Sequence, residues 1–358
     1  MGFRLSTGLL ILVTLVILWG CGGHGSSSSH PAFVPLTGQN RVAGLKVNDG
    51  SGSLSSVSGS PFITGNSPRA VLIHPSKKFV FVANSLDNTI SLFTVGASGA
   101  LTEVTPRTPT VNSPGVLATD SAGNFLYVAN TVANSISVYA VDSATGALAE
   151  IAGSPFPSAA PVAMAFSPPD NVLYVANATT STVSAYNVTS GVLTSITGSP
   201  FAAGPNPSSI AIDAGGHFLF ASNITSTTFA GFAITPATGA LSAIPGSPFT
   251  AGTHPSSLAF DNSDKFLYVA NLDSNNISAF SIDATTGTPT QVTGSPYTVG
   301  TAPIFVAADT SGKYLYVVNQ TSGNISEFAV DATAGTLKAT SQSTFTVGSS
   351  PAGISIAK

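Results

Sequence analysis

Side chains that could carry chemistry are sparse in this chain. Charged residues make up 7% of its 358 residues, with 11 Lys and Arg against 15 Asp and Glu, and there are five His and one Cys. A hydrolytic site needs one group that activates water and another that stabilises the developing oxyanion. Arg69, directly after Pro68, could do the second. No carboxylate or imidazole accompanies it at equivalent positions, so Arg69 is the single catalytic candidate, and we expect it to be non-catalytic.

The histidines do not form a site in the sequence. His74 lies within a strand-like run, where we expect a structural role. We expect His217 and His254 to lie near the channel mouth as loop residues. His24 and His30 lie in a Gly- and Ser-rich tract, which makes a poor metal site. The sequence contains no nucleophile elbow, phosphate loop, dinucleotide fingerprint or metal box. It therefore predicts no metal and no cofactor.

A repeat of about 47 residues supplies the elements that would position these side chains. Apolar segments that end in Asn recur at steps of 46, 47, 46, 48 and 48 residues: Phe79–Asn84, Phe125–Asn130, Val172–Asn177, Phe218–Asn223, Phe266–Asn271 and Tyr314–Asn319. A proline opens every unit, and a seventh opening stands near the carboxyl end: Pro68, Pro114, Pro161, Pro207, Pro255, Pro303 and Pro351. Six units are complete, and the seventh is only begun.

Each complete unit holds four strand-like runs punctuated by Gly, Asn, Asp and Pro. In the second run, alternate residues point to opposite faces, and both faces are apolar: Phe266 and Tyr268 on one, Leu267 and Val269 on the other. A strand buried on both faces fits a blade packed between two neighbours around an axis. A net charge of −4 without a basic stripe argues against a nucleic-acid partner.

The two ends of the repeat region together supply a seventh blade. The tail Pro351–Lys358 provides one strand, and the segments 32–36, 41–47 and 54–57 provide three more. We therefore predict an all-β fold: a seven-bladed β-propeller with four-stranded blades over residues 32–358, closed by a C-terminal strand joining three N-terminal strands. Closure of this kind removes exposed strand edges.

The YVAN and YVVN segments resemble the YVTN-type β-propeller repeat of bacterial lactonase-like proteins, including the 6-phosphogluconolactonase type, and of surface-layer proteins. The resemblance covers residues 32–358 and implies a propeller fold. It also implies an Arg-His pair just after the opening proline of one blade. Arg69 is present here, but Ala70 stands where the histidine of the family would be.

The residues that follow the opening prolines should face the mouth of the central channel. These seven predicted channel-mouth residues are Arg69, Gly115, Val162, Ser208, Ser256, Ile304 and Ala352. The repeated Asn at the end of each second run is interpreted as structural, because Asn bonds nearby backbone and tolerates left-handed dihedral angles. Asp142, Asp283 and Asp331 begin short loops that end in Gly, and we interpret them as turns rather than calcium sites, since each offers one carboxylate.

The amino terminus is predicted to be an export signal. A positive start and the apolar run Leu9–Trp19 end at Leu18-Trp19-Gly20-Cys21, which resembles the bacterial lipoprotein lipobox and implies lipid attachment at Cys21. We expect residues 1–20 to be the signal peptide and residues 21–31 a flexible tether. The only cysteine of the chain is then the anchor, and no disulfide is available.

These observations favour an exported, non-catalytic β-propeller that acts as a binding or scaffold module, lipid-anchored at the bacterial cell envelope on its periplasmic or outer-surface face. Its partner would be an unidentified protein or glycan, and it would contact the membrane only through the lipid. The alternative is a lactonase of the 6-phosphogluconolactonase-like propeller type. A surface-layer building block is a third possibility.

Overall fold

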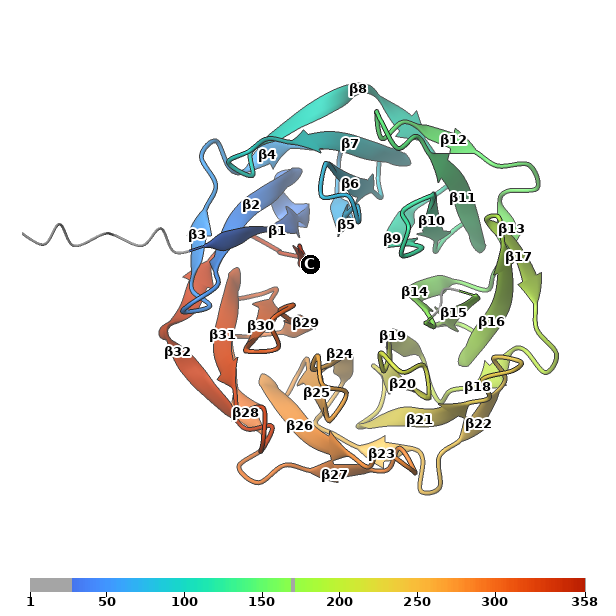
Figure 1. Cartoon of the computed structure of the whole chain (residues 1–358), viewed down its shortest axis with the longest axis vertical. Helices are drawn as coiled ribbons and strands as arrows, with labels where there is room; N and C mark the ends of the chain where they lie inside the picture. The colour runs from blue at the N-terminus through green and yellow to red at the C-terminus, as the bar shows by residue number, and fades with distance from the viewer. Residues whose placement is uncertain (1–27, 169–170, 358) are drawn as a thin grey trace, which may run out of the picture.

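The structure, a computed structural model, describes residues 28–168 and 171–357. These residues form seven antiparallel sheets arranged as blades around a central axis (Figure 1). We number the blades 1 to 7 from Pro68, so that blade 7 contains both ends of the described chain. The predicted seven-bladed β-propeller is confirmed. The predicted signal peptide, residues 1–20, and Cys21 lie outside the described residues.

The strands of the first three blades follow one another directly along the chain. Blade 1 contains β5 (Pro68–Ile73), β6 (Phe79–Asn84), β7 (Thr89–Val95) and β8 (Leu101–Pro109). Blade 2 contains β9 (Pro114–Thr119), β10 (Phe125–Asn130), β11 (Ser135–Val141), β12 (Leu148–Glu150) and β13 (Phe156–Pro157). Blade 3 contains β14 (Pro161–Phe166), β15 (Val172–Asn177), β16 (Thr182–Thr189), β17 (Val192–Ser195) and β18 (Phe201–Ala202).

The remaining blades complete the ring. Blade 4 contains β19 (Pro207–Ile212), β20 (Phe218–Asn223), β21 (Thr228–Ile234), β22 (Leu241–Ala243) and β23 (Phe249–Thr250). Blade 5 contains β24 (Pro255–Phe260), β25 (Phe266–Asn271), β26 (Asn276–Ile282), β27 (Pro289–Gln291) and β28 (Tyr297–Thr298). Blade 6 contains β29 (Pro303–Ala308), β30 (Tyr314–Asn319), β31 (Asn324–Val330) and β32 (Leu337–Thr346). Blade 7 contains β1 (Ser29–Leu36), the short 3-10 helix η1 (Thr37–Gln39), β2 (Arg41–Asn48), β3 (Leu54–Ser56), β4 (Phe62–Ile63) and β33 (Ser355–Ile356).

Five of the blades have one strand more than the four predicted. In these blades the outer strand is interrupted at the Gly-Ser-Pro sequence, and the chain re-pairs with the third strand as a short fifth one. In blade 7, for example, Gly59 has φ +83° and the Ser60 hydroxyl accepts a hydrogen bond from the backbone N–H of Gly44 at 2.9 Å. The Ser60 hydroxyl therefore takes the place of an outer-strand carbonyl as acceptor for β2, and the backbone hydrogen-bond ladder between the third and outer strands is interrupted there. Blades 1 and 6, without this sequence, have four strands.

The second strand of each blade is the most buried, as its two apolar faces predict. Its aromatic residue also links blades: the Tyr316 hydroxyl donates to the carbonyl of Gly52 in the next blade at 2.6 Å. Tyr174 and Tyr268 make the same bond to Gly239 and Gly335. The accepting residue has a left-handed φ, +70° at Gly52, and a Cβ there would lie 2.3 Å from the Tyr314 ring. Only glycine fits this turn.

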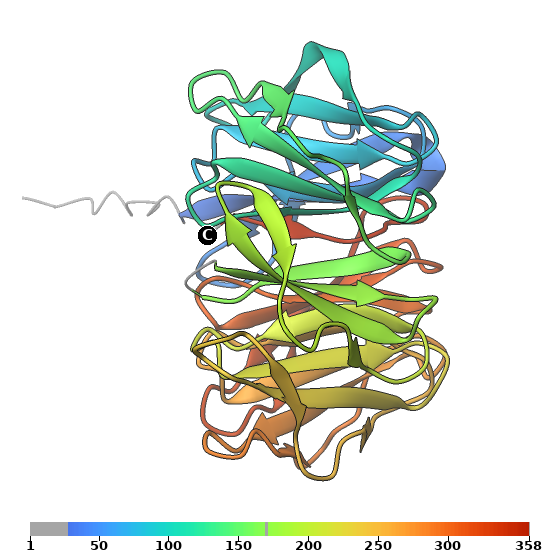
Figure 2. The same cartoon turned by 90° about the vertical axis from the view of Figure 1, so that its right-hand side faces the viewer.

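The ring closes between the two ends of the chain, as the sequence predicted. In β33, Ile356 pairs with Ala32 of β1, and Ser355 pairs with Phe33. The backbone N–H of Ala357 donates to Pro31 at 2.9 Å. Figure 2 shows that the chain enters on the face where the C-terminus also lies. β1 begins at Ser29, before the predicted start at residue 32, because Ser29 and its neighbours pair with β2 down to Asn48. The last residues of the predicted tether therefore belong to the sheet.

No helix in residues 28–168 and 171–357 is long and apolar enough to cross a bilayer.

Candidate functional site

A β-bulge begins the innermost strand of six blades. In blade 1, Pro68 pairs with Asn84 and Ala70 pairs with Ala83, so that Arg69 between them has no partner in the ladder. The same shift leaves out the residue after the proline in blades 2 to 6. Bulges re-aim side chains and are frequent beside binding sites. The residue after each proline is therefore released from strand pairing at the start of the channel.

These residues surround a central cavity of about 350 Å³. The structure places all seven predicted channel-mouth residues in its lining: Arg69, Gly115, Val162, Ser208, Ser256, Ile304 and Ala352. We call this ring the mouth. Most of the other lining residues are apolar in type, but more than half of the surface that the cavity wall exposes is polar. Figure 1 shows the first strands of the blades as the elements nearest the axis.

Among residues 28–168 and 171–357, Arg69 is the only charged one that lines this cavity. Its side chain is exposed, and it has no hydrogen bond or ion pair with any residue that the structure describes. The other described Lys and Arg residues lie outside the cavity lining. Arg107, for instance, forms an ion pair with Glu103 at 2.7 Å. The Arg69 guanidinium thus offers its donors to whatever occupies the mouth.

The mouth serines are engaged with protein. The Ser256 hydroxyl donates to the carbonyl of Pro303 in the next blade at 2.7 Å. The Ser208 hydroxyl donates to the backbone carbonyl of Ser256 at 3.1 Å and lies 2.9 Å from the Ser222 hydroxyl. These bonds tie neighbouring blades together at the channel, and they leave neither serine beside a base that would activate it as a nucleophile.

An imidazole–carboxylate pair lies close to the mouth along the chain. His254 precedes Pro255, and its Nδ1 lies 2.6 Å from the Asp273 carboxylate. The imidazole is 40% exposed. His254 has φ +55°, as do, within a few degrees, the residues before the other opening prolines. His254 is therefore one of seven equivalent residues, each directly before an opening proline. These seven form a second ring that does not line the cavity.

The other three histidines in the blades occupy different places. His30, predicted to lie in a linker, is in β1 instead, where its Nδ1 lies 2.7 Å from the Asp49 carboxylate. His217 was predicted to lie near the mouth, but it pairs with Asp213 at 3.1 Å in a turn where β19 ends, at the opposite end of the channel. His74 is buried, and its two ring nitrogens lie 2.8 Å from the Ser76 hydroxyl and from the carbonyl of Gly123 in blade 2. The structural role expected of His74 is confirmed: it joins two blades.

The repeated Asn residues are buried and structural, as predicted, and Asn130 bonds nearby backbone at Val128, but none of the six is left-handed and their recurrent partner is a serine. The amide of Asn84 donates to the Ser91 hydroxyl at 3.0 Å, and the same bond recurs in blades 2, 3, 5 and 6. The left-handed residue of the hairpin is instead Asn88, four residues later. Because the Ser is seven residues further along, the pairing was not evident from the strand ends alone.

The Asp-initiated loops form turns, as predicted. One carboxylate oxygen of Asp142 accepts the backbone N–H groups of Ala144 and Thr145, at 3.1 and 2.8 Å. The hydrogen bond from the Thr145 hydroxyl, together with these two backbone bonds, holds the pKa of the Asp142 carboxyl below its usual value. Gly146 follows with φ +75°. Among the described residues no group of three His, Cys, Asp or Glu side chains is placed to hold a metal ion.

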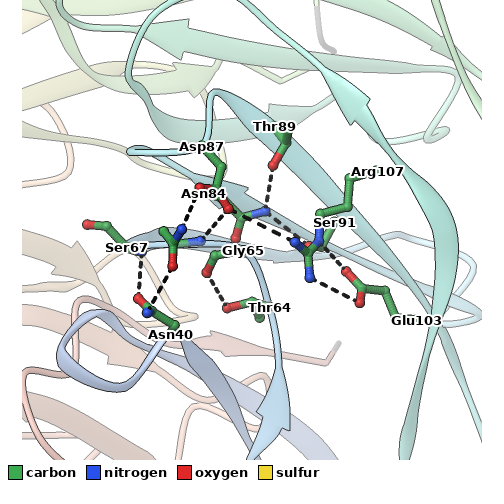
Figure 3. Close-up of polar contacts among 11 residues, drawn as sticks. Asn40, Thr64, Gly65, Ser67, Asn84, Asp87, Thr89, Ser91, Glu103 and Arg107 are labelled. Atoms are coloured by element: carbon green, nitrogen blue, oxygen red, sulfur yellow. Dashed lines mark hydrogen bonds and ion pairs between the residues drawn. The ribbon is translucent and has the colours of Figure 1, made fainter.

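A polar network stiffens the mouth next to Arg69. The Asp87 carboxylate accepts the backbone N–H of Asn66 at 2.6 Å and its side-chain amide at 2.7 Å (Figure 3). Asn66 in turn accepts a bond from the Asn40 amide at 3.0 Å. The network joins blades 7 and 1 on either side of the loop that leads into Pro68. It therefore fixes the backbone that carries Arg69.

The fold and the mouth define a seven-bladed propeller whose channel, in the part of the chain that the structure describes, presents the Arg69 guanidinium as its one charged group. A family model described as "Lactonase, 7-bladed beta-propeller" matches residues 26–205, 193–302 and 293–352. The chain belongs to this family.

Solved structures share the fold at low sequence identity. A proposed 6-phosphogluconolactonase of Bacteroides uniformis has a TM-score of 0.81 and 17% identity, with 92% of this chain and 99% of that chain covered. The periplasmic gluconolactonase PpgL of Pseudomonas aeruginosa has a TM-score of 0.78 and 20% identity, with 92% and 99% covered. No curated protein matches the chain in sequence.

Two features of the site were missed at the level of sequence. The bulge after each proline has no signature of its own, although the repeated proline marks its place. The pairing of His254 with Asp273 joins two turns that are 19 residues apart. Both belong to the same blade, and the repeat length is the signal from which this proximity could have been inferred.

Proposed function

We propose that this propeller hydrolyses a lactone at the mouth of its channel. The membership of the lactonase family supports this alternative over the non-catalytic scaffold expected above. The observation that carries the proposal is Arg69, whose guanidinium has no partner among the described residues and is the one charged group that they place on the cavity wall. A preorganised donor in such a place stabilises the oxyanion that forms when water adds to a carbonyl.

The reaction needs a proton acceptor as well. We propose His254 for this role, because its Nδ1 is held by Asp273 at 2.6 Å and its Nε2 is left for the solvent. His254 lies outside the cavity lining, in blade 5 while Arg69 is in blade 1, so the proton reaches Nε2 through intervening water as the attacking water adds to the lactone carbonyl. Arg69 donates hydrogen bonds to the carbonyl oxygen as charge develops. The ring C–O bond then breaks, the ring oxygen takes the proton from His254, and the product is a hydroxy acid.

The Arg69 assignment is tested by lactone hydrolysis with the purified full chain. Arg69→Ala should lower kcat/KM by about 100-fold, the usual effect of removing one oxyanion donor. The matched control is Arg41→Ala, because the Arg41 guanidinium donates to the carbonyl of Pro61 and does not line the cavity. A wild-type chain inactive on gluconolactone, phosphogluconolactone and alkyl lactones alike would refute the proposal, and so would an Arg69→Ala variant with full activity.

The His254 assignment has its own control within the chain. His254→Gln should reduce kcat with little change in KM, because the residue acts on water rather than on bound substrate. His217→Gln, which alters an equally carboxylate-paired histidine at the far end of the channel, should leave kcat unchanged. Equal losses in the two variants would contradict the role of His254.

We further propose that the propeller is held at the envelope by lipid on Cys21. β1 begins at the end of the channel where Ile356 lies, opposite to Arg69. A chain tethered there would direct the mouth away from the bilayer. Cys21→Ser should move the protein from the membrane fraction to the soluble fraction; a variant that stays with the membrane would contradict lipid anchoring.

A further inference from the structure

The mouth cavity has one side-chain hydroxyl that the protein does not use. Four serines of the described chain line the cavity: Ser208, Ser209, Ser256 and Ser257. Ser208 and Ser256 donate to carbonyls of neighbouring blades, and Ser257 accepts the backbone N–H of Val306 at 3.3 Å. Ser209 is partly exposed, and its hydroxyl has no hydrogen bond with any residue in 28–168 and 171–357. It can therefore bond to a ligand in the cavity.

The fold does not require a hydroxyl at the position of Ser209. This residue is the second after an opening proline, and it pairs with Ser222 in the ladder of blade 4. The equivalent residues are Ala70 in blade 1 and Ala163 in blade 3, which pair with their second strands in the same register. Because the same backbone is built there with alanine, the Ser209 hydroxyl is not needed for the strand.

Ser209 and Arg69 lie on opposite sides of the cavity. Arg69 belongs to β5 of blade 1 and Ser209 to β19 of blade 4, and both line the cavity. Two blades separate them in one direction around the ring and three in the other (Figure 1). A ligand that fills the cavity therefore meets a cation on one side and a neutral hydroxyl on the other.

The two groups differ in what they can bind. A guanidinium only donates hydrogen bonds, so Arg69 fits a carbonyl or carboxylate oxygen. A serine hydroxyl donates one bond and accepts others, so Ser209 fits a hydroxyl group of the ligand. A phosphate on the Ser209 side would find no cation there, because the described lining residues of blades 3, 4 and 5 are uncharged.

We infer that Ser209 is a specificity-determining residue, which binds a hydroxyl of the substrate while Arg69 holds the lactone carbonyl on the other side of the cavity. The inference rests on the lactonase function proposed above, and it makes the site selective for hydroxylated lactones over unsubstituted ones. The hydrogen bond lies away from the reacting carbonyl, so it is equally strong in the bound substrate and in the transition state. It should therefore lower KM and leave kcat unchanged.

A comparison of gluconolactone with δ-valerolactone, which has the same ring without hydroxyls, tests this with the full chain. Ser209→Ala should lower the ratio of kcat/KM for the two lactones about fivefold, the factor that a net hydrogen bond of about 1 kcal/mol gives. The change should come from a higher KM for gluconolactone, with the kcat for gluconolactone and the kcat/KM for δ-valerolactone unchanged. A merely structural role would alter the hydrolysis of both lactones.

Ser257→Ala is the matched control, because Ser257 is the equivalent residue of blade 5. Its side chain is buried, with 3% of the residue exposed, and already bonds to Val306, so it is not available to a ligand. This variant should lower the thermal stability and leave the ratio of the two lactones as in the wild type. An equal fall of the ratio in both variants would overturn the inference.

Binding of gluconate, the hydroxy acid that gluconolactone yields, gives a readout without catalysis. Its Kd, measured by calorimetry, should rise about fivefold in Ser209→Ala. Hydrolysis of gluconolactone with a ratio that Ser209→Ala does not change overturns the inference and leaves the lactonase function. Binding of gluconate that depends on Ser209, without hydrolysis of either lactone, overturns the lactonase function and supports the hydroxyl site. Neither binding nor hydrolysis overturns both.

Discussion

The carboxyl group of Glu327 should make the stability of the ring depend on pH. Glu327 lies in β31 of blade 6, with no exposed surface. One of its oxygens lies 3.3 Å from the Thr340 hydroxyl, and the other has no hydrogen bond of good geometry to a described residue. Burial raises the pKa of Glu327 from 4.5 to about 7, which the Thr340 hydroxyl and the Leu54 backbone N–H offset only in part.

The direction of the effect follows from the raised pKa. Below pH 4.5 the group is protonated in the folded and unfolded chain, so folding carries no charge penalty. As the pH rises to about 7, the unfolded chain ionises first, and stability falls. At 1.36 kcal/mol for each pKa unit, the loss is about 3 kcal/mol. For a propeller of this size that corresponds to about 4 °C in Tm.

Glu327→Gln keeps the shape of the side chain and removes its titration. Its free energy of unfolding, from urea denaturation, should match that of the wild type near pH 4 and exceed it by about 3 kcal/mol at pH 8. Glu327→Ala should show the same loss of pH dependence, because Ala279 fills the equivalent position of blade 5. If the stability of the Gln variant falls with pH between 4.5 and 7 as steeply as that of the wild type, the buried charge is not the cause.

The remaining predictions concern the joints between blades. Tyr316→Phe leaves the carbonyl of Gly52 without its donor and should cost about 1–2 kcal/mol in urea unfolding. Tyr186→Phe, with an exposed hydroxyl, should change stability by less than about 0.5 kcal/mol, and equal effects would contradict the importance of the buried bond. Ending the chain before Ile354 removes β33 and bares β1, so it should lower Tm and produce aggregates in size-exclusion chromatography; a monomer of unchanged Tm would show that this strand does not close the ring.

The fold was predictable because each feature is stated several times in the sequence. The buried strand of FLYVAN type, the opening proline and the Asp-initiated turn recur from blade to blade, and each repetition tests the others. The closure of the ring was predictable because the single strand after Pro351 supplies the first strand of a blade, and the three strand-like segments near the N-terminus supply the other three. The repeat does not predict the local hydrogen bonds. The serine that replaces a carbonyl in the outer strand and the Asn–Ser pair both depend on side-chain positions that only the folded sheet defines.

The site was predictable in place but not in chemistry. The rule that the residue after the proline faces the channel needs only the repeat, and all seven residues line the cavity. The pairing of His254 with Asp273 and the shape of the cavity beside Arg69 depend on how seven strands converge. Motif searches also look for several catalytic groups close together, whereas here a single arginine faces a wall of uncharged residues.

Departures from the repeat carry the functional information in this chain. At the position of Glu327 the other blades have Gly44, Leu92, Val138, Ala185, Gly231 and Ala279, all uncharged. Arg69 is likewise the only charged member of its ring, and His254 the only imidazole of the ring before the prolines. The same backbone is built in the other blades with uncharged side chains, so the fold does not require a charge at any of these three positions. Two of the three, Arg69 and His254, lie at the mouth end of the channel, where the proposed reaction places them.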